Sequence, residues 1–231
     1  MLLTSVLLAS ALLHGGQKLQ VTDLKVGSGD TAKNGDVLVM NYTGKLTSGK
    51  VFDSTDLHPG KEPFKFVLGL GVVVKGWDQG LVGMKVGGKR HLIIPPALGY
   101  GQRAMGADIP ANSTLVFDVE LKGIERLPHQ TTKAGSGPAI KGGDTIQLHF
   151  ILKDKGGKQI ESTYEHEQPA TMRVGQQGVP EVIWAAVFGM KQGEKRNCTI
   201  PAKYSFATPQ NTKIPMNTDL VFNLEMVKVG Q

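Results

Sequence analysis

Cysteine is nearly missing from this chain of 231 residues, and its scarcity excludes disulfide bonds as a source of stability. Cys198 is the one cysteine, so no bridge can form within the chain. It lies in segment 197–200, where the alternation of polar and apolar residues predicts a strand. We therefore interpret Cys198 as a buried structural thiol rather than a nucleophile.

Runs of like charge are also missing, which argues against a surface that binds nucleic acid. The net charge is +6, yet no five consecutive residues carry the same charge. Hydrophobic residues make up 40% of the chain and charged residues 20%, as in ordinary globular proteins. We expect a solvated surface of mixed charge and no nucleic-acid partner.

Long apolar runs are confined to the N-terminus. Residues 2–13 are apolar but too few to span a bilayer, so we expect no stable membrane span. The small residues Ala9 and Ala11 around Ser10 suit signal-peptidase cleavage, which predicts a signal peptide within 1–18 and export to the periplasm or the medium. No Lys or Arg precedes the apolar run. A disordered tail on a cytoplasmic protein therefore remains the alternative.

The usual catalytic signatures do not occur. The chain has no Gly-x-Ser-x-Gly, no phosphate loop ending in Gly-Lys-Ser/Thr and no His-Glu-x-x-His. Its six histidines do not cluster with carboxylates. We expect no metal site and no cofactor.

What the chain does contain is an internal repeat. Lys25 returns as Lys133, at an offset of 108, and Leu115 returns as Leu220, at an offset of 105. Further matched segments are 35–36 with 143–144, 49–55 with 157–163, 83–85 with 189–191, and 109–110 with 214–215. A long period with a slowly drifting offset indicates a duplicated unit with small loop deletions. We predict two domains, 19–127 and 128–231.

Each repeat is expected to be rich in short strands. Glycine (30 residues) and proline (12) favour turns over long helices. Strands are predicted at 37–43, 64–68, 90–94 and 114–121, with a hairpin over 45–52 that turns at Ser48-Gly49. Trp77, Leu81 and Val82 have the spacing of a short amphipathic helix. The fold class is α+β, an antiparallel sheet packed on one short helix.

The first repeat resembles the FKBP-type peptidyl-prolyl isomerases over about 105 residues. The motifs that carry the resemblance occur in the family's order and spacing: Asn41-Tyr-Thr-Gly44, Gly49-Lys-Val-Phe-Asp-Ser54, Pro63-Phe-Lys-Phe66, Val73-Val-Lys-Gly-Trp77, Gly83-Met-Lys-Val-Gly87, Ile94-Pro-Pro96, Gly99-Tyr-Gly101, Ile109-Pro110 and Leu115-Val-Phe117. The resemblance implies two FKBP-like domains, each a curved antiparallel sheet wrapped around a short helix. A pocket would lie between the helix and the concave face of the sheet.

The resemblance also assigns the pocket residues. Those that would act on the substrate are Tyr42, Asp53, Trp77 and Tyr100, and those that would bind it are Phe52, Phe64, Val73, Val74, Ile109 and Phe117. Trp77 would form the floor under the prolyl ring, the other aromatic side chains would form the walls, and Asp53 would be a charged group at the edge. The Val74 amide and the Tyr100 hydroxyl would bind peptide carbonyl groups.

Some positions depart from the family pattern. A basic residue common in the loop after Phe52 has no clear counterpart, and His58 and Lys61 are the candidates. Val72 stands before the helix, where an acidic residue is frequent. Differences of this kind affect which peptide is preferred.

The implied activity is the rotation of X-Pro bonds during protein folding, without covalent catalysis. Partners would be proline-containing polypeptides, and macrolide inhibitors are a further expectation. The alternative is a module that binds prolyl peptides, or a chaperone, in which turnover is incidental.

The second repeat lacks the groups that this activity needs. The aligned replacements are Tyr42 by Phe150, Phe52 by Ile160, Asp53 by Glu161, Phe64 by Ala170, Val74 by Pro180, Trp77 by Ile183 and Tyr100 by Phe206, while Phe117 is matched by Phe222. Proline has no amide hydrogen to donate. Trp184 is one place out of register with Trp77 and is not expected to replace it. We predict a folded but catalytically silent second domain.

Overall fold

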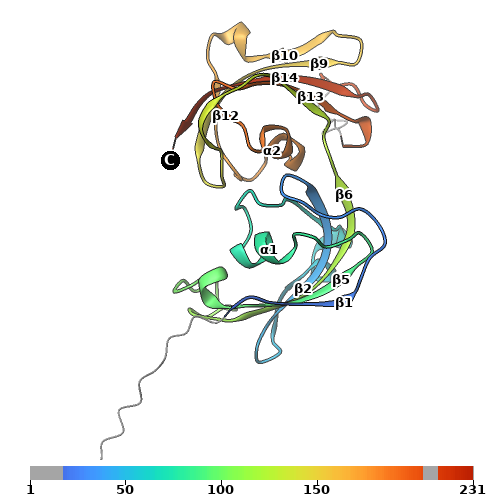
Figure 1. Cartoon of the computed structure of the whole chain (residues 1–231), viewed down its shortest axis with the longest axis vertical. Helices are drawn as coiled ribbons and strands as arrows, with labels where there is room; N and C mark the ends of the chain where they lie inside the picture. Colours follow the sequence, from blue (N-terminus) through green and yellow to red (C-terminus); the bar gives the residue numbers. More distant parts are fainter. Residues whose placement is uncertain (1–17, 205–212, 231) are drawn as a thin grey trace, which may run out of the picture.

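The computed structural model of the chain describes residues 18–204 and 213–230. The apolar segment of the expected signal peptide or tail lies outside the described residues, as does Phe206. The two repeats form two similar halves, each with one sheet and one short α-helix (Figure 1).

The first half holds six strands, which form one antiparallel sheet in the order β1-β5-β6-β2-β3, with β4 paired to β2. Their bounds are β1 (Gln20–Lys25), β2 (Val37–Leu46), β3 (Val51–Ser54), β4 (Phe64–Val67), β5 (Lys89–Ile94) and β6 (Leu115–Glu125). The helices of this half are α1 (Lys75–Gly80) and the single 3₁₀ turns η1 (Thr55–Leu57), η2 (Pro59–Lys61) and η3 (Pro96–Leu98).

The second half repeats this plan, with sheet order β10-β9-β14-β13-β7 and β11 paired to β9. Its strands are β7 (His129–Lys133), β8 (Ser136–Ala139), β9 (Thr145–Asp154), β10 (Gln159–Ser162), β11 (Ala170–Arg173), β12 (Lys191–Gln192), β13 (Lys195–Ile200) and β14 (Leu220–Gly230). Its helices are α2 (Glu181–Val187), η4 (Thr163–His166) and η5 (Ala202–Tyr204), and β8 pairs with β12 apart from the main sheet.

The predicted α+β class is confirmed, and the hairpin turns where the sequence placed it. Gly49 has φ of 88°, a left-handed value that glycine adopts without a steric penalty, and its amide donates to the carbonyl of Leu46. Within the first half, the strand that we did not predict is β1. All six of its residues are exposed, so they give no buried alternation, and its pairing with β5 defines it.

Cys198 occupies β13 with 1% of its surface exposed, so the interpretation as a buried thiol is confirmed. Burial raises the pKa of this thiol to about 11, against the smaller opposing effect of the Arg196 charge. At neutral pH the nucleophilic thiolate is therefore scarce, as the structural role requires.

The two α-helices differ in how much of their surface is covered. In α1 the buried residues are Gly76, Trp77 and Gly80, on the side that faces the first sheet. In α2 all six residues from Val182 to Val187 are buried. A helix that is apolar all round needs cover on both sides. Figure 1 shows α2 between its own sheet and the first half.

Apolar contacts across the boundary supply that second cover. Val37, Val67 and Leu70 of the first half are almost fully buried and belong to the core cluster of the second half. The ring of Phe188 lies against Gly35, so close that a Cβ there would be 2.8 Å from its Cδ1 atom. The two halves thus share a hydrophobic core at their junction.

Arg126, in the segment between β6 and β7, holds the connection in place. Its guanidinium donates to both carboxylate oxygens of the buried Asp36, at 2.8 and 3.0 Å, and also to Asp30 and the Thr31 carbonyl. Bidentate pairs of this kind fix geometry as well as contribute energy. The connection between the halves is therefore tied to the segment between β1 and β2.

The junction leads to a test of stability. A Cβ at Gly142 would lie 2.6 Å from the carbonyl oxygen of Gly71, across the junction, where the Gly142 amide donates to Leu70. We expect Gly142→Ala to lower the free energy of unfolding by about 1–3 kcal/mol, because backbone atoms have to move apart. Chemical denaturation of the full chain measures this.

Gly123→Ala is the matched control. Its Cβ would meet the Val39 side chain at 3.8 Å, an ordinary contact, so no loss of stability is expected. Equal stability of the two variants would show that the halves do not approach as closely as described.

Candidate functional site

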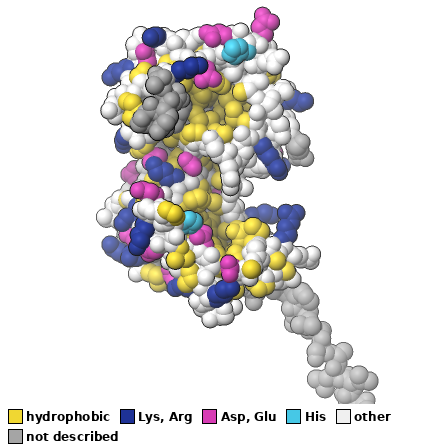
Figure 2. All heavy atoms as spheres, turned by 180° about the vertical axis from the view of Figure 1, so that it is seen from behind, with side chains coloured by type: hydrophobic (Ala, Val, Ile, Leu, Met, Phe, Trp, Pro, Cys, Tyr) yellow, Lys and Arg dark blue, Asp and Glu magenta, His cyan; other side chains and the backbone are white. Residues whose placement is uncertain are grey.

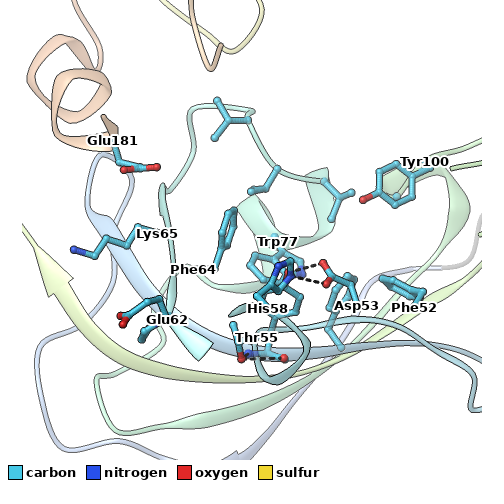
Figure 3. Close-up of a pocket in the computed structure, with 17 residues that line it drawn as sticks. Phe52, Asp53, Thr55, His58, Glu62, Phe64, Lys65, Trp77, Tyr100 and Glu181 are labelled. Atoms are coloured by element: carbon cyan, nitrogen blue, oxygen red, sulfur yellow. Dashed lines mark hydrogen bonds and ion pairs between the residues drawn. The ribbon is translucent and has the colours of Figure 1, made fainter. Parts of the chain in front are cut away.

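A cavity of about 950 Å³ opens between α1 and the concave face of the first sheet. Nine of the ten residues assigned to the site line it: Tyr42, Phe52, Asp53, Phe64, Val73, Val74, Trp77, Tyr100 and Phe117. They come from β2, β3, β4, β6, α1 with the segment before it, and the loop after η3. Figure 3 shows five of them, Phe52, Asp53, Phe64, Trp77 and Tyr100, around one space. The tertiary fold therefore gathers residues that are up to 75 positions apart, from Tyr42 to Phe117.

Ile109 is the exception. Its side chain is 7% exposed and belongs to the first core cluster, and it is not part of the cavity lining. Backbone hydrogen bonds in both directions with Met105 close the loop that carries it. In this structure it is a buried member of the same core cluster as Trp77 and Phe117.

Trp77 is the centre of the aromatic lining. Its ring packs edge-on with Tyr42 at 5.3 Å and with Phe117 at 5.2 Å between centroids, and it also contacts Phe64 and Phe66. Such edge-to-face contacts contribute beyond the burial of area. With only 4% of its surface exposed, the indole closes the bottom of the cavity. Its Nε1 atom is buried and has no hydrogen-bond partner among the described residues.

One carboxylate stands at the edge of this apolar space. Asp53 accepts a hydrogen bond from the Tyr42 hydroxyl at 2.5 Å, and its other oxygen lies 2.8 Å from Nε2 of His58 (Figure 3). Of the two candidates for a basic residue in this loop, His58 is the one that pairs with Asp53. The carboxylate is therefore held in one orientation from two sides.

The two tyrosine hydroxyls of the cavity are kept protonated. Burial raises the pKa of Tyr42, and its hydrogen bond to the Asp53 carboxylate raises it further. Burial also raises the pKa of Tyr100, with a contribution from the Asp53 charge. In Figure 3 the Tyr100 hydroxyl points toward the cavity. It is thus a donor available to a ligand.

The loop that leads into α1 is fixed by a residue that our sequence reasoning missed. Asp78 accepts hydrogen bonds from the amides of Gly69, at 2.8 Å, and Gly71, at 3.0 Å. This holds the segment that carries Val74, the residue that caps α1 and whose carbonyl accepts from the Trp77 amide. No described residue accepts a hydrogen bond from the Val74 amide itself. Spacing alone gives no signal for the role of Asp78.

The corresponding part of the second half is built from other side chains. Phe150 packs against Phe222 at 5.1 Å, which keeps an aromatic contact but supplies no hydroxyl. Ile183 and Trp184 are both buried in the second core cluster. Pro180 caps α2 with φ and ψ of −56° and 141°, nearly those of Val74 at −58° and 142°. The backbone frame is kept while the amide donor is lost.

Among the described residues, no group of three or more His, Cys, Asp or Glu side chains is arranged to hold a metal ion. No helix within residues 18–204 and 213–230 is long and apolar enough to cross a membrane. On the face that Figure 2 presents, basic and acidic side chains are interspersed rather than gathered by sign.

Comparison with known proteins finds the same family in both halves. A family model described as "FKBP-type peptidyl-prolyl cis-trans isomerase" matches residues 29–122 and 137–227. The chain is 53% identical over 103 residues to "FK506-binding protein 4" of Rhizopus delemar, covering 45% of this chain and 26% of that protein. It is 51% identical over 124 residues to "Peptidyl-prolyl cis-trans isomerase FKBP2" of Mus musculus, covering 53% of this chain and 87% of that protein.

Among solved structures, the crystal structure of the three FKBP domains of wheat FKBP73 is similar with a TM-score of 0.45 and 24% identity. The match covers 91% of this chain and 94% of that one. This chain spans only 26, 21 and 22% of the first three curated relatives, the FK506-binding proteins 4 of three fungi.

The hydrogen-bond network at Asp53 gives a test by titration. The pKa of Tyr42 and of Tyr100 is higher in the folded chain than in the unfolded chain. The stabilisation that these two protonated hydroxyls contribute is therefore complete below about pH 10, and it is lost as the pH rises through their folded-state pKa. Asp53→Asn removes the negative charge, and we expect both tyrosines to ionise at lower pH than in the wild type. Phenolate absorbance against pH measures this.

Glu225→Gln is the control, because Glu225 in the other half accepts a hydrogen bond from the Tyr164 hydroxyl at 2.6 Å. Burial is the largest cause that raises the pKa of Tyr164 to about 12, and the hydrogen bond to Glu225 is the next. That variant should move the ionisation of Tyr164 alone. An Asp53→Asn titration that overlays the wild type would contradict the network.

Proposed function

The chain belongs to the family of FKBP-type peptidyl-prolyl cis-trans isomerases, and from that premise we propose that its first repeat, residues 19–127, catalyses X-Pro rotation. The observation that carries the proposal is the cavity itself. Nine of the ten expected residues line one apolar space with an indole floor, an oriented carboxylate at its edge and an inward hydroxyl.

Such a site has to lower the free energy of the twisted amide relative to the planar amide. Rotation about X-Pro has a barrier of about 18–20 kcal/mol because the planar amide must lose its resonance. The twisted amide has less charge separation than the planar form, so removal from water penalises the planar form more. An apolar cavity thereby favours the transition state over the ground state. No nucleophile, proton transfer or cofactor is needed.

Hydrogen-bond donors at the cavity add to this effect. The Tyr100 hydroxyl and the Val74 amide are both available to carbonyl groups of a bound peptide. Donors that are already in place cost no reorganisation when the amide rotates. Tyr42 and Asp53, joined by their hydrogen bond, would contact the peptide at the edge of the site. Trp77 would support the prolyl ring from below.

The second repeat, residues 128–231, we propose to be catalytically silent. Phe150 in place of Tyr42, Pro180 in place of Val74 and Ile183 in place of Trp77 remove a hydroxyl, an amide donor and the indole floor. Its shared core with the first repeat supports a role in binding or in holding the first repeat in position.

The partners that we propose are proline-containing polypeptides, with macrolides as inhibitors of the same cavity. We also propose that residues 1–18 direct export, on the strength of the apolar segment 2–13 and the small residues Ala9 and Ala11 within it. Sequencing the N-terminus of the protein from cells checks the export proposal. A mature start between Ser10 and Gln17 is expected, and an intact Met1 or Leu2 would contradict it.

Isomerase activity is tested by protease-coupled hydrolysis of a prolyl peptide with the full chain. Tyr100→Phe removes one donor, and we expect kcat/KM to fall about tenfold. Trp77→Ile gives the first repeat the residue that the second repeat carries, and we expect a larger loss. Asp53→Ala is also expected to lower the rate.

Glu161→Ala, at the aligned position of the second repeat, is the control for Asp53→Ala and should leave the rate unchanged. Unfolding temperatures separate loss of function from loss of fold. A wild-type rate at background, or an unchanged rate when Asp53→Ala and Tyr100→Phe are combined, would refute the enzyme proposal. Tight binding of a prolyl peptide without turnover would then favour a binding module or chaperone.

A further inference from the structure

The cavity of the first repeat extends to a residue of the second. Glu181, the first residue of α2, is part of the cavity lining together with Glu62 and Lys65 of the first repeat. Figure 3 shows the Glu181 side chain on the far side of Phe64 from Tyr100, at the end of the cavity where Glu62 and Lys65 lie. A peptide that leaves the prolyl site in this direction meets the second repeat.

Packing fixes Glu181 at this end. The remainder of α2 is buried between the two halves, so the helix has no freedom to turn its first residue away. On the same side, Val72 packs so closely on Gly175 that a Cβ there would lie 2.5 Å from its Cγ1 atom. The backbone of Glu181 is therefore held beside the cavity by the packing of the two halves.

Two carboxylates of the cavity lining lie at this end, Glu62 and Glu181. Lys65 forms an ion pair with the nearly buried Glu125 at 2.7 Å. Lys203 lines a smaller hollow together with Glu181, and its ammonium lies 4.6 Å from the centre of the Tyr204 ring. Neither Glu62 nor Glu181 forms an ion pair or hydrogen bond with any described residue. Lys65, the lysine of the cavity lining, thus has a partner, whereas these two carboxylates have none.

The surface between the prolyl site and these carboxylates is apolar. Phe64 is 41% exposed and Val72 is 37% exposed, and both line the cavity. A side chain suited to such a surface has a long aliphatic stem that covers the apolar part and a cationic head that reaches the carboxylates. Lysine and arginine have this form.

We propose that Glu181, together with Glu62, forms a subsite that selects prolyl substrates with a lysine or arginine near the proline, on the side of the peptide that runs toward the second repeat. This inference rests on the proposed isomerase function and specifies its substrate class. It gives the catalytically silent repeat a direct part in substrate choice, through one carboxylate that the first repeat cannot supply.

The test is a panel of prolyl peptides that differ from one another at a single position. That position is in turn each of the four on either side of the proline, and it carries Lys, norleucine or Glu. We measure kcat/KM and peptide affinity with the full chain at low salt. At one or more positions on one side, the wild type should favour Lys over norleucine by about two- to fivefold, as for a partly exposed ion pair. Higher salt should reduce this preference.

Variants assign the preference to its source. Glu181→Gln should reduce the preference for Lys over norleucine, and Glu181→Lys should reverse it in favour of Glu. Glu161→Gln, an exposed carboxylate of the same repeat outside the cavity, is the matched control and should keep the wild-type preference. Glu62→Gln should give a partial loss.

Two results would overturn the proposal: equal use of Lys, norleucine and Glu by the wild type at every position, or a Lys preference that survives Glu181→Gln unchanged. Failure of the isomerase proposal is recognised separately, because the norleucine peptide would then not be turned over by any variant. Peptide affinity would still report the charge preference in that case.

Discussion

The burial of α2 on both sides is the constraint on which the arrangement of this protein depends. A seven-residue helix whose residues from Val182 onward are all buried needs cover from two surfaces, and only one belongs to its own repeat. Val37, Val67 and Leu70 of the first repeat provide the other. The two sheets therefore share a core at their junction, and the Arg126 pairs with Asp36 hold the connection beside it.

Duplication has kept the backbone and changed the chemistry. Val74 and Pro180 cap their helices with nearly equal φ and ψ, because proline's ring favours the value of φ that the cap already has. The same replacement removes an amide donor from the second site. Ile183 likewise keeps an apolar residue where the first repeat has Trp77, without the ring that closes its cavity. A fold can thus persist while the groups that bind a peptide are lost, since packing needs volume and shape whereas binding needs particular donors.

Much of the site followed from the sequence because its motifs match those of one family in order and spacing, and that resemblance assigns the pocket residues. Tyr42, Phe52, Asp53 and Trp77 were assigned in this way, and they meet in the cavity. Ile109 was assigned to the same lining, and it is buried in the first core cluster without being among the residues that line the cavity. His58 was one of two candidates, and only the distance to Asp53 separates it from Lys61. Asp78 gave no signal, because its role depends on where the amides of Gly69 and Gly71 point.

By itself, the sequence determined the repeat, the α+β class and the chemical difference between the two copies, because these depend on residue identity and on spacing along the chain. It also indicated that Cys198 is structural, from the alternation around it. Only the tertiary structure decided that the copies share a core and that Glu181 reaches the cavity of the other repeat. Such contacts join residues far apart in the chain, such as Gly71 with Gly142 and Gly35 with Phe188. They depend on the angle at which two sheets pack, and no local pattern of residues encodes that angle.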